Sequence, residues 1–318
     1  MIMEVQHETR LEYSEPVTES LTEVRMEPVS GSEQSCRSFH LMVSPLTQLF
    51  RYQDGFGNRV HHFNVLAGHI EVRILAASLV ETHPRPLELH SCQAAYPLDP
   101  EQLDLGALDY LKFRGPVRST PRLAPLLEIL RPQPGQSLAG LVLQVADYIH
   151  SHFEYARAVT LSSSPIDDVL EQGKGVCQDF THLMIAVLRS FGIPARYVSG
   201  YLHRPNKESQ SHAWCEAWLP DVGWVGIDPT NDLAVNDHFI KVAIGRDFSD
   251  IPPNKGVYRG QAEEKISVRV ETRALERLPS MAWQDELPPL QVPLMAIASR
   301  NLRQTSPAEE LSQQQQQQ

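Results

Sequence analysis

Residues 173–180 read Gly-Lys-Gly-Val-Cys-Gln-Asp-Phe and open a segment with the pattern of an amphipathic helix. Up to Phe191, apolar side chains recur at steps of three and four residues, as one buried helix face requires. Gly192 then stands where a left-handed helix end belongs, and Pro194 prevents continuation. The pattern predicts a helix that begins near Cys177 and ends before Gly192.

This helix start places Cys177 for chemistry. The partial positive charge at a helix N-terminus favours a thiolate, and helix starts lower cysteine pKa values. The unpaired amides of a first helical turn can donate to a developing oxyanion, and the backbone amide of Cys177 is one candidate donor. Gly173 and Gly175 let the backbone approach a ligand closely. The alternative is a small buried core thiol, which is the commoner fate of a lone cysteine.

A thiol nucleophile needs a base and a group that orients the base. Two strand-like runs downstream, residues 212–219 and 224–228, carry His212 and Asp228. Taken alone, a histidine at a strand start is usually structural, and an aspartate before proline usually forms a turn. Their joint appearance after a helix-start cysteine favours a triad of Cys177, His212 and Asp228.

The register of this hairpin decides whether the histidine and the aspartate can meet. A four-residue loop, 220–223, would place them on opposite faces of the sheet. A five-residue loop, 219–223, pairs Trp218 with Trp224 and brings the histidine diagonal to the aspartate, at roughly 7–8 Å between backbones. We predict the five-residue loop, or a bulge with the same parity.

Three tryptophans, Trp214, Trp218 and Trp224, are candidate walls of a substrate-binding site. Such walls would exclude water from a site beside the thiol. The alternative is that all three pack within the sheet, as tryptophans of a sheet more often do.

A zinc site is the metal-binding alternative to the triad. Cys215 points to the strand face opposite His212, so it is expected to be a core thiol. A zinc site built from these two residues with Cys177 and His182 would need both strand faces at once. We therefore expect no metal and no cofactor.

The composition bounds the class of protein. The 318 residues include 28 Lys and Arg against 39 Asp and Glu, a net charge of -11, which argues against nucleic-acid or membrane-surface partners. No run approaches the roughly 18 apolar residues of a membrane span. No export signal is readable at the N-terminus, and the four cysteines form no CxxC pair. We expect a cytoplasmic protein with reduced thiols.

The first third of the chain predicts β-structure. Short alternating runs, such as residues 39–43 and 70–74, are separated by turn residues that include Asp-Gly-Phe-Gly-Asn at 54–58. Several short strands with turns between them suggest an antiparallel β-sandwich. A proline-rich stretch from Pro97 to Pro134 then predicts a connector.

Four blocks of sequence resemble the transglutaminase-like superfamily, and more narrowly its bacterial members with an N-terminal β region. They are Gly-Val-Cys-Gln-Asp-Phe at 175–180, Gly-Ile-Pro-Ala-Arg-Tyr-Val-Ser-Gly-Tyr at 192–201, His-Ala-Trp-Cys-Glu-Ala-Trp at 212–218 and Trp-Val-Gly-Ile-Asp-Pro-Thr at 224–230. The similarity covers about residues 137–260. It implies a papain-like core in which a helix delivers the cysteine to a sheet that carries the histidine and the aspartate.

We therefore predict an α+β fold with three segments. Residues 1–110 are expected to form the N-terminal antiparallel β-sandwich, and residues 111–273 the papain-like transglutaminase core, with the cysteine helix packed on an antiparallel sheet. Residues 274–318 end in six glutamines and are expected to be a polar, disordered tail.

The resemblance implies an enzyme that acts on amide bonds through a thioester acyl-enzyme. Water as the second attacker would give a peptidase, amidase or deamidase, and a lysine-like amine would give protein-glutamine acyl transfer. The expected partners are a protein or peptide with an amide group and, for transfer, an amine acceptor. The alternative is a non-enzymatic peptide-binding or scaffold protein that keeps the fold.

Overall fold

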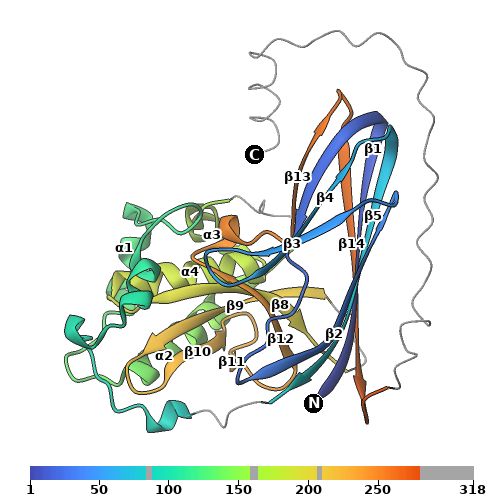
Figure 1. The fold of residues 1–318 in the computed structure, drawn as a ribbon. Helices are drawn as coiled ribbons and strands as arrows, with labels where there is room; N and C mark the ends of the chain where they lie inside the picture. The colour runs from blue at the N-terminus through green and yellow to red at the C-terminus, as the bar shows by residue number, and fades with distance from the viewer. Residues whose placement is uncertain (84–87, 158–163, 206–209, 280–318) are drawn as a thin grey trace.

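The computed structural model describes residues 1–83, 88–157, 164–205 and 210–279. Its fold is of the predicted α+β class, with a large antiparallel sheet and a second part in which helices pack on a smaller sheet (Figure 1). Within the described ranges, no helix combines the length and the apolar character that crossing a membrane requires.

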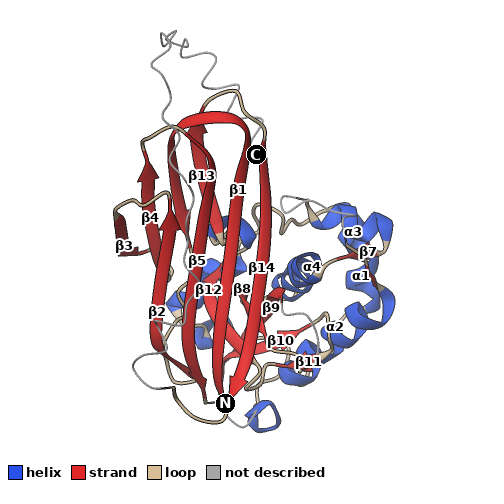
Figure 2. Cartoon of the chain, turned by 90° about the vertical axis from the view of Figure 1, so that its right-hand side faces the viewer, coloured by secondary structure: helices blue, strands red, loops and turns tan. Residues whose placement is uncertain are grey.

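The first sheet has the order β2-β5-β1-β4-β3, and β13 and β14 also pair with β1. One half of β1 pairs with β5 and β14, and the other half with β4 and β13. Figure 2 shows β5, β1 and β14 side by side. The two layers predicted as a sandwich are thus parts of one sheet, joined through β1. The strands are β1 (Ile2–Val24), β2 (Gln34–Ser44), β3 (Leu49–Gln53), β4 (Arg59–Val65), β5 (His69–Thr82), β13 (Asn254–Arg259) and β14 (Glu264–Leu275).

An irregularity near the middle of β1 lets this strand serve both halves of the sheet. Its pairing with β5 shifts register between Glu12 and Val17, and Glu19 has a φ of 54°. Pro16 lies inside the irregular stretch, where a residue without a backbone N–H is tolerated in a sheet.

The second part is built on a five-stranded sheet with the order β11-β10-β9-β8-β12. Helix α4 packs mainly on β9 and β8, with α2 and α3 beside it (Figures 1 and 2). Its helices are α1 (Ala124–Ile129), α2 (Leu138–His152), α3 (Ile166–Gln172) and α4 (Cys177–Ser190). Its strands are β8 (Ala195–Leu202), β9 (Gln210–Leu219), β10 (Gly223–Asp228), β11 (Leu233–Ala234) and β12 (Phe239–Gly245), and a separate pair is formed by β6 (Glu154–Tyr155) and β7 (Lys174–Gly175).

The two parts share one apolar core. Met3 and Val5 of β1 belong to the same buried cluster as Leu183 and Met184 of α4. The proline-rich stretch also packs on this cluster, since Val117 is fully buried in it. The stretch predicted as a connector therefore lies against the core.

The end of the described chain returns to the first sheet. Residues 254–275, which the sequence places largely in the catalytic core, pair with β1 along its length, for example Val268 with Thr9. The predicted boundary at residue 273 thus does not separate the two parts, because strand alternation does not reveal which sheet a strand joins. The predicted tail beyond residue 279 lies outside the described residues.

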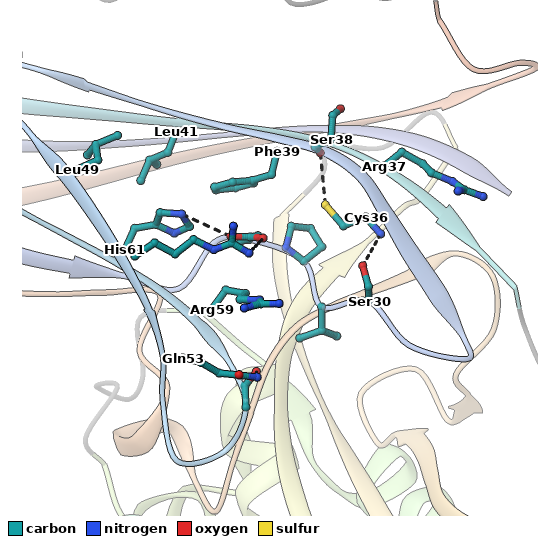
Figure 3. Close-up of a pocket in the computed structure, with 15 residues that line it drawn as sticks. Ser30, Cys36, Arg37, Ser38, Phe39, Leu41, Leu49, Gln53, Arg59 and His61 are labelled. Carbon is teal, nitrogen blue, oxygen red and sulfur yellow. Dashed lines mark hydrogen bonds and ion pairs between the residues drawn. The ribbon is translucent and has the colours of Figure 1, made fainter.

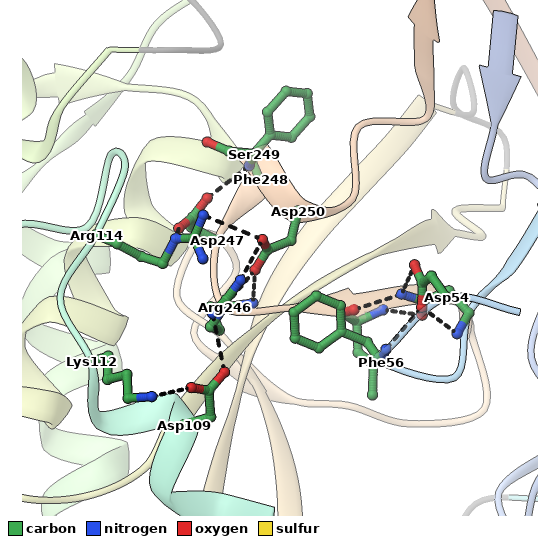
Figure 4. A network of polar contacts seen from close by, with 12 residues as sticks. Asp54, Phe56, Asp109, Lys112, Arg114, Arg246, Asp247, Phe248, Ser249 and Asp250 are labelled. Atoms are coloured by element: carbon green, nitrogen blue, oxygen red, sulfur yellow. Dashed lines mark hydrogen bonds and ion pairs between the residues drawn. The ribbon is translucent and has the colours of Figure 1, made fainter.

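Polar contacts join the first sheet, the proline-rich stretch and β12 at one place (Figure 4). A guanidinium nitrogen of Arg246 lies 3.2 Å from a carboxylate oxygen of Asp109, and its Cζ lies 5.2 Å from the ring centroid of Phe56. The side-chain amide of Asn58 both donates to and accepts from the backbone of Ile244, at 2.8 Å in each case. These contacts hold the first sheet against the second part.

A cavity of about 570 Å³ is lined by residues of β2, β3 and β4 and of the segment after β1 (Figure 3). Glu27 accepts a hydrogen bond of 2.8 Å from Arg51, and its other oxygen lies 3.5 Å from Nε2 of His61. The rings of Phe39 and His61 are 5.1 Å apart. All residues that line this cavity belong to the first sheet and its loops.

Candidate active site

The start of α4 is fixed by a side-chain cap next to Cys177. Asp179 is 2% exposed, and its Oδ2 accepts the backbone N–H of Val176 at 2.8 Å. An added Cβ at Gly175 would lie 2.9 Å from the Cβ of Asp179, so glycine makes room for this cap. Cys177 is the first residue of the helix, and its backbone amide therefore belongs to the first turn, whose amides have no partner within the helix.

The far end of α4 also follows the sequence. The helix ends at Ser190, and Gly192 adopts a φ of 77°, the left-handed conformation predicted for this glycine. The face that packs against the sheet is buried from Phe180 onward. The helix is therefore held along its whole length, and Cys177 stands at its exposed end, partly accessible to solvent.

The hairpin of β9 and β10 has the predicted register. Trp218 pairs with Trp224, and Cys215 pairs with Ile227. With this parity, Nε2 of His212 lies 2.7 Å from Oδ2 of Asp228. The imidazole and the carboxylate therefore lie on the same face of the sheet, as the triad requires.

The carboxylate of Asp228 is fully buried and has several donors. Its Oδ1 accepts the backbone N–H of Thr230 at 2.9 Å, and its Oδ2 accepts the side-chain amide of Asn231 at 2.5 Å. Burial alone would raise the pKa of Asp228, but its hydrogen bonds to His212 and Asn231 outweigh burial and lower the pKa. The carboxylate is therefore held ionised and in one orientation.

His212 lies between the carboxylate and the thiol. Burial alone would lower its pKa, but hydrogen bonding and charge from Asp228 and Cys177 raise it to about 10. Because Nε2 is bonded to Asp228, Nδ1 is the ring nitrogen that remains for the thiol of Cys177. This arrangement favours an imidazolium beside the sulfur of Cys177.

A cavity of about 210 Å³ adjoins His212. Tyr155 of β6 lies at the same cavity and close to the nucleophile, since burial and then the charge of Cys177 raise the pKa of this tyrosine. The pairing of Tyr155 with Gly175 brings it beside the start of α4. The cavity is lined by Tyr155, Arg157, Leu202, Arg204, Ser211, His212, Thr230 and Asn231.

The three tryptophans do not form the walls of this cavity. Trp218 and Trp224 lie at the opposite end of the hairpin from His212, where Trp224 packs on Tyr110, with 5.0 Å between ring centroids. Trp214 is fully buried, and its ring centroid lies 6.5 Å from that of His212. The proposed walls are thus wrong for the first two residues, and Trp214 supports the histidine from within the sheet.

Cys215 is fully buried in the cluster under α4, the position expected from strand alternation. His182 is also buried, and its Nε2 accepts the backbone N–H of Phe248 at 3.1 Å. Neither residue faces the cavity beside His212. Among the described residues, no group of three or more His, Cys, Asp or Glu side chains is arranged to hold a metal ion.

Sequence reasoning missed several residues around the triad. Asn231 follows Asp-Pro-Thr at 228–230. In this turn the side chain of Asp228 accepts a hydrogen bond from the backbone N–H of Thr230, two residues further on, which is a known pattern of aspartate in turns. That signature was available in the sequence. Tyr155 gave no local signal, because only the tertiary fold brings it to the cavity.

Comparisons with known proteins agree with this architecture. Residues 130–229 match the family model of the transglutaminase-like superfamily, and residues 3–81 match that of the bacterial transglutaminase-like N-terminal region. A solved structure from Cytophaga hutchinsonii, described as a candidate cysteine protease, has a TM-score of 0.73 at 22% identity. The match covers 88% of this chain and 93% of that chain, and it shows the shared fold.

Relatives of similar length are found among mycobacteria. An uncharacterized protein of Mycobacterium leprae is 35% identical over 284 residues, which cover 86% of this chain and 99% of the relative. A protein-glutamine gamma-glutamyltransferase of Pseudomonas aeruginosa is 30% identical over 161 residues, which cover 46% of this chain and only 24% of that protein. The chain belongs to the transglutaminase-like superfamily, with the N-terminal region found in its bacterial members.

Proposed function

We propose that this protein is a cysteine enzyme that takes an acyl group from an amide through a Cys177 thioester. The observation that carries the proposal is the 2.7 Å hydrogen bond between His212 and Asp228, formed beside a cysteine at a helix start. A base held by a buried carboxylate is what a thiol nucleophile requires. A scaffold protein has no need of this arrangement.

In the first step, the thiol proton passes to Nδ1 of His212 and the sulfur attacks the amide carbon. A C–S bond forms, and the carbonyl electron pair moves onto oxygen. In this proposal the first-turn amides of α4, including that of Cys177, donate to the oxyanion, because Cys177 begins the helix. The C–N bond then breaks as His212 returns its proton to the leaving nitrogen, so ammonia or an amine departs and a thioester remains.

In the second step, water or an amine attacks the thioester, and His212 accepts the proton of the attacking group. The C–S bond breaks, and the thiol is restored when His212 gives the proton back to sulfur. Water gives hydrolysis and an amine gives acyl transfer. The P. aeruginosa relative named as a protein-glutamine gamma-glutamyltransferase supports glutamine side chains of proteins or peptides as the amide donors.

The proposal is tested by trapping the acyl-enzyme. The protein is incubated with a library of glutamine-containing peptides and a biotin-linked primary amine, and intact mass is recorded after rapid acid quenching. We expect a thioester adduct on Cys177, loss of ammonia from a subset of peptides, and no adduct in Cys177→Ala. Cys36→Ala, which removes a thiol far from His212 in the first sheet, is the matched control and should retain the adduct. If the unchanged protein consumes no peptide amide, just as Cys177→Ala is expected to consume none, the proposed function is wrong.

A further inference from the structure

The cavity beside His212 carries two positive charges. Of the described residues that line it, Arg157 and Arg204 are cationic and none is acidic. The carboxylate of the triad, that of Asp228, is fully buried and is already hydrogen-bonded to His212. The whole chain has a net charge of -11, so the charge of this cavity is opposite in sign to the net charge of the protein.

Arg204 is held in place beside the triad. One of its terminal nitrogens donates a hydrogen bond of 2.8 Å to Oδ1 of Asn231. The amide nitrogen of Asn231 in turn donates to Asp228, so a continuous chain of hydrogen bonds runs from Arg204 to His212. An arginine anchored by one nitrogen still has other N–H groups to offer to a ligand.

Arg157 also lines the cavity and interacts with Tyr155. Burial raises the pKa of Tyr155, Cys177 raises it further, and Arg157 and Arg204 both oppose this rise. Both guanidinium groups are therefore within electrostatic range of the tyrosine that lies beside the nucleophile. Arg157 itself is exposed at the end of β6, where it can meet an incoming substrate.

We propose that Arg157 and Arg204 select substrates that carry a carboxylate next to the amide attacked by Cys177, such as an acidic residue neighbouring the reactive glutamine. A guanidinium group pairs with a carboxylate through charge and paired N–H donors, and this pairing is stronger in a partly desolvated cavity. This inference rests on the proposed function of the Cys177 site. It adds to that function a preference for acidic protein or peptide segments.

The test uses two small electrophiles of nearly equal size. Iodoacetate carries a carboxylate and iodoacetamide a neutral amide, each one bond from the carbon that is attacked. In both reactions the sulfur of Cys177 forms a C–S bond, the C–I bond breaks, and iodide leaves. The ratio of the two rate constants divides out any change in the reactivity of the thiolate, so it reports the effect of the substrate charge alone.

Rates at Cys177 are measured by peptide mass spectrometry for the unchanged protein and for four variants. Arg157→Gln and Arg204→Gln remove one charge each, while Arg204→Lys keeps the charge. Arg118→Gln is the matched control, because Arg118 is exposed and donates only to the backbone of Gly115 outside the cavity. We expect the iodoacetate to iodoacetamide ratio to fall roughly threefold or more in each Gln variant and to stay near its original value in Arg204→Lys and Arg118→Gln.

Different results would contradict the proposed function of Cys177 and the preference for acidic substrates. If iodoacetamide does not react rapidly with Cys177 in the unchanged protein, the proposed function fails. If iodoacetamide reacts rapidly but the ratio is the same in Arg157→Gln, Arg204→Gln and the unchanged protein, only the preference for acidic substrates is overturned. Arg157 has no role in the hydrogen bonds of Asp228, so its variant decides the question even if Arg204→Gln disturbs the triad.

Discussion

His212 and Asp228 are joined by a hydrogen bond of 2.7 Å between Nε2 and Oδ2, across sixteen positions of sequence. The histidine is 8% exposed and the aspartate is fully buried. Water therefore cannot readily replace either partner, and the ring is held with its other nitrogen free for Cys177. In the proposed mechanism, the reactivity of the thiol depends on this pair.

Asp228→Asn is expected to slow alkylation of Cys177 by iodoacetamide at pH 6.5 at least about tenfold. The neutral amide removes the charge that helps to raise the pKa of His212, so the imidazolium beside the sulfur is less populated. Rates are measured by peptide mass spectrometry. Asp237→Asn, which changes an exposed carboxylate near His238, should leave the rate unchanged. Equal rates in both variants would show that Asp228 does not act on the thiol.

His212 also predicts how stability changes with pH. Its folded pKa is raised to about 10 from an ordinary value of 6.5. Below pH 6.5 both the folded and the unfolded states hold the proton, so the stabilisation is complete. Above pH 6.5 the unfolded state loses the proton first, and the stabilisation declines until about pH 10.

The free energy of unfolding in urea is compared for the unchanged protein and His212→Gln at pH 6 and pH 10. We expect the advantage of the unchanged protein to shrink by at least about 1.4 kcal/mol, which corresponds to one unit of pKa difference. Titrating groups that do not interact with His212 are common to both proteins and cancel in this comparison. A constant advantage across this range would contradict the raised pKa of His212.

Glu216→Gln is expected to destabilise the fold by about 3–5 kcal/mol, measured by urea unfolding at pH 7. Glu216 is 2% exposed and pairs with Arg196 at 2.6 Å and with Lys241. Burial alone would raise its pKa, but these two cations lower it to about 2. The substitution removes the carboxylate that pairs with Arg196 in the interior, while Lys241 keeps an ion pair of 3.1 Å with Glu33. Glu171→Gln, which breaks the exposed ion pair with Arg122, should have no resolvable effect. An equally small effect of Glu216→Gln would contradict this account.

Gly200→Ala is expected to reduce both stability and Cys177 reactivity. An added Cβ would lie 2.0 Å from the backbone oxygen of Ile240 and 2.7 Å from the ring of Trp214. The displaced tryptophan stands behind His212, so the histidine should shift as well. Thermal unfolding and the iodoacetamide rate measure the two effects. Gly55→Ala, whose new Cβ has no neighbour within 4 Å, is the control. If both variants match the unchanged protein, this packing is not needed.

The sequence was sufficient for the parts of the site that follow local rules. The periodicity after Cys177 and the glycine at 192 define α4, and the parity of the β9–β10 loop places Asp228 on the face of His212. Each of these predictions needed only residues that are near one another in the chain. The α+β class and the buried position of Cys215 followed in the same way.

Features that depend on tertiary pairing were not predictable. The strand β1 runs through both halves of the first sheet, but Pro16 and the polar residues near it interrupt the alternation that marks a strand. The return of β14 to β1 joins segments at opposite ends of the chain. Trp218 and Trp224 lie on the same strands as His212 and Asp228. They are at the other end of the hairpin, however, and do not line the cavity.

The central claim is that Cys177 alone among the cysteines is an activated nucleophile. Burial raises the pKa values of the other three thiols, to about 11 for Cys36 and upward as well for Cys92 and Cys215. The direct measurement is the rate of iodoacetamide labelling at each cysteine of the folded protein at pH 6, resolved by peptide mass spectrometry. The account predicts that Cys177 reacts at least about a hundred times faster than the others and that His212→Gln abolishes this difference. Slow labelling of Cys177, equal to that of Cys36, would contradict it.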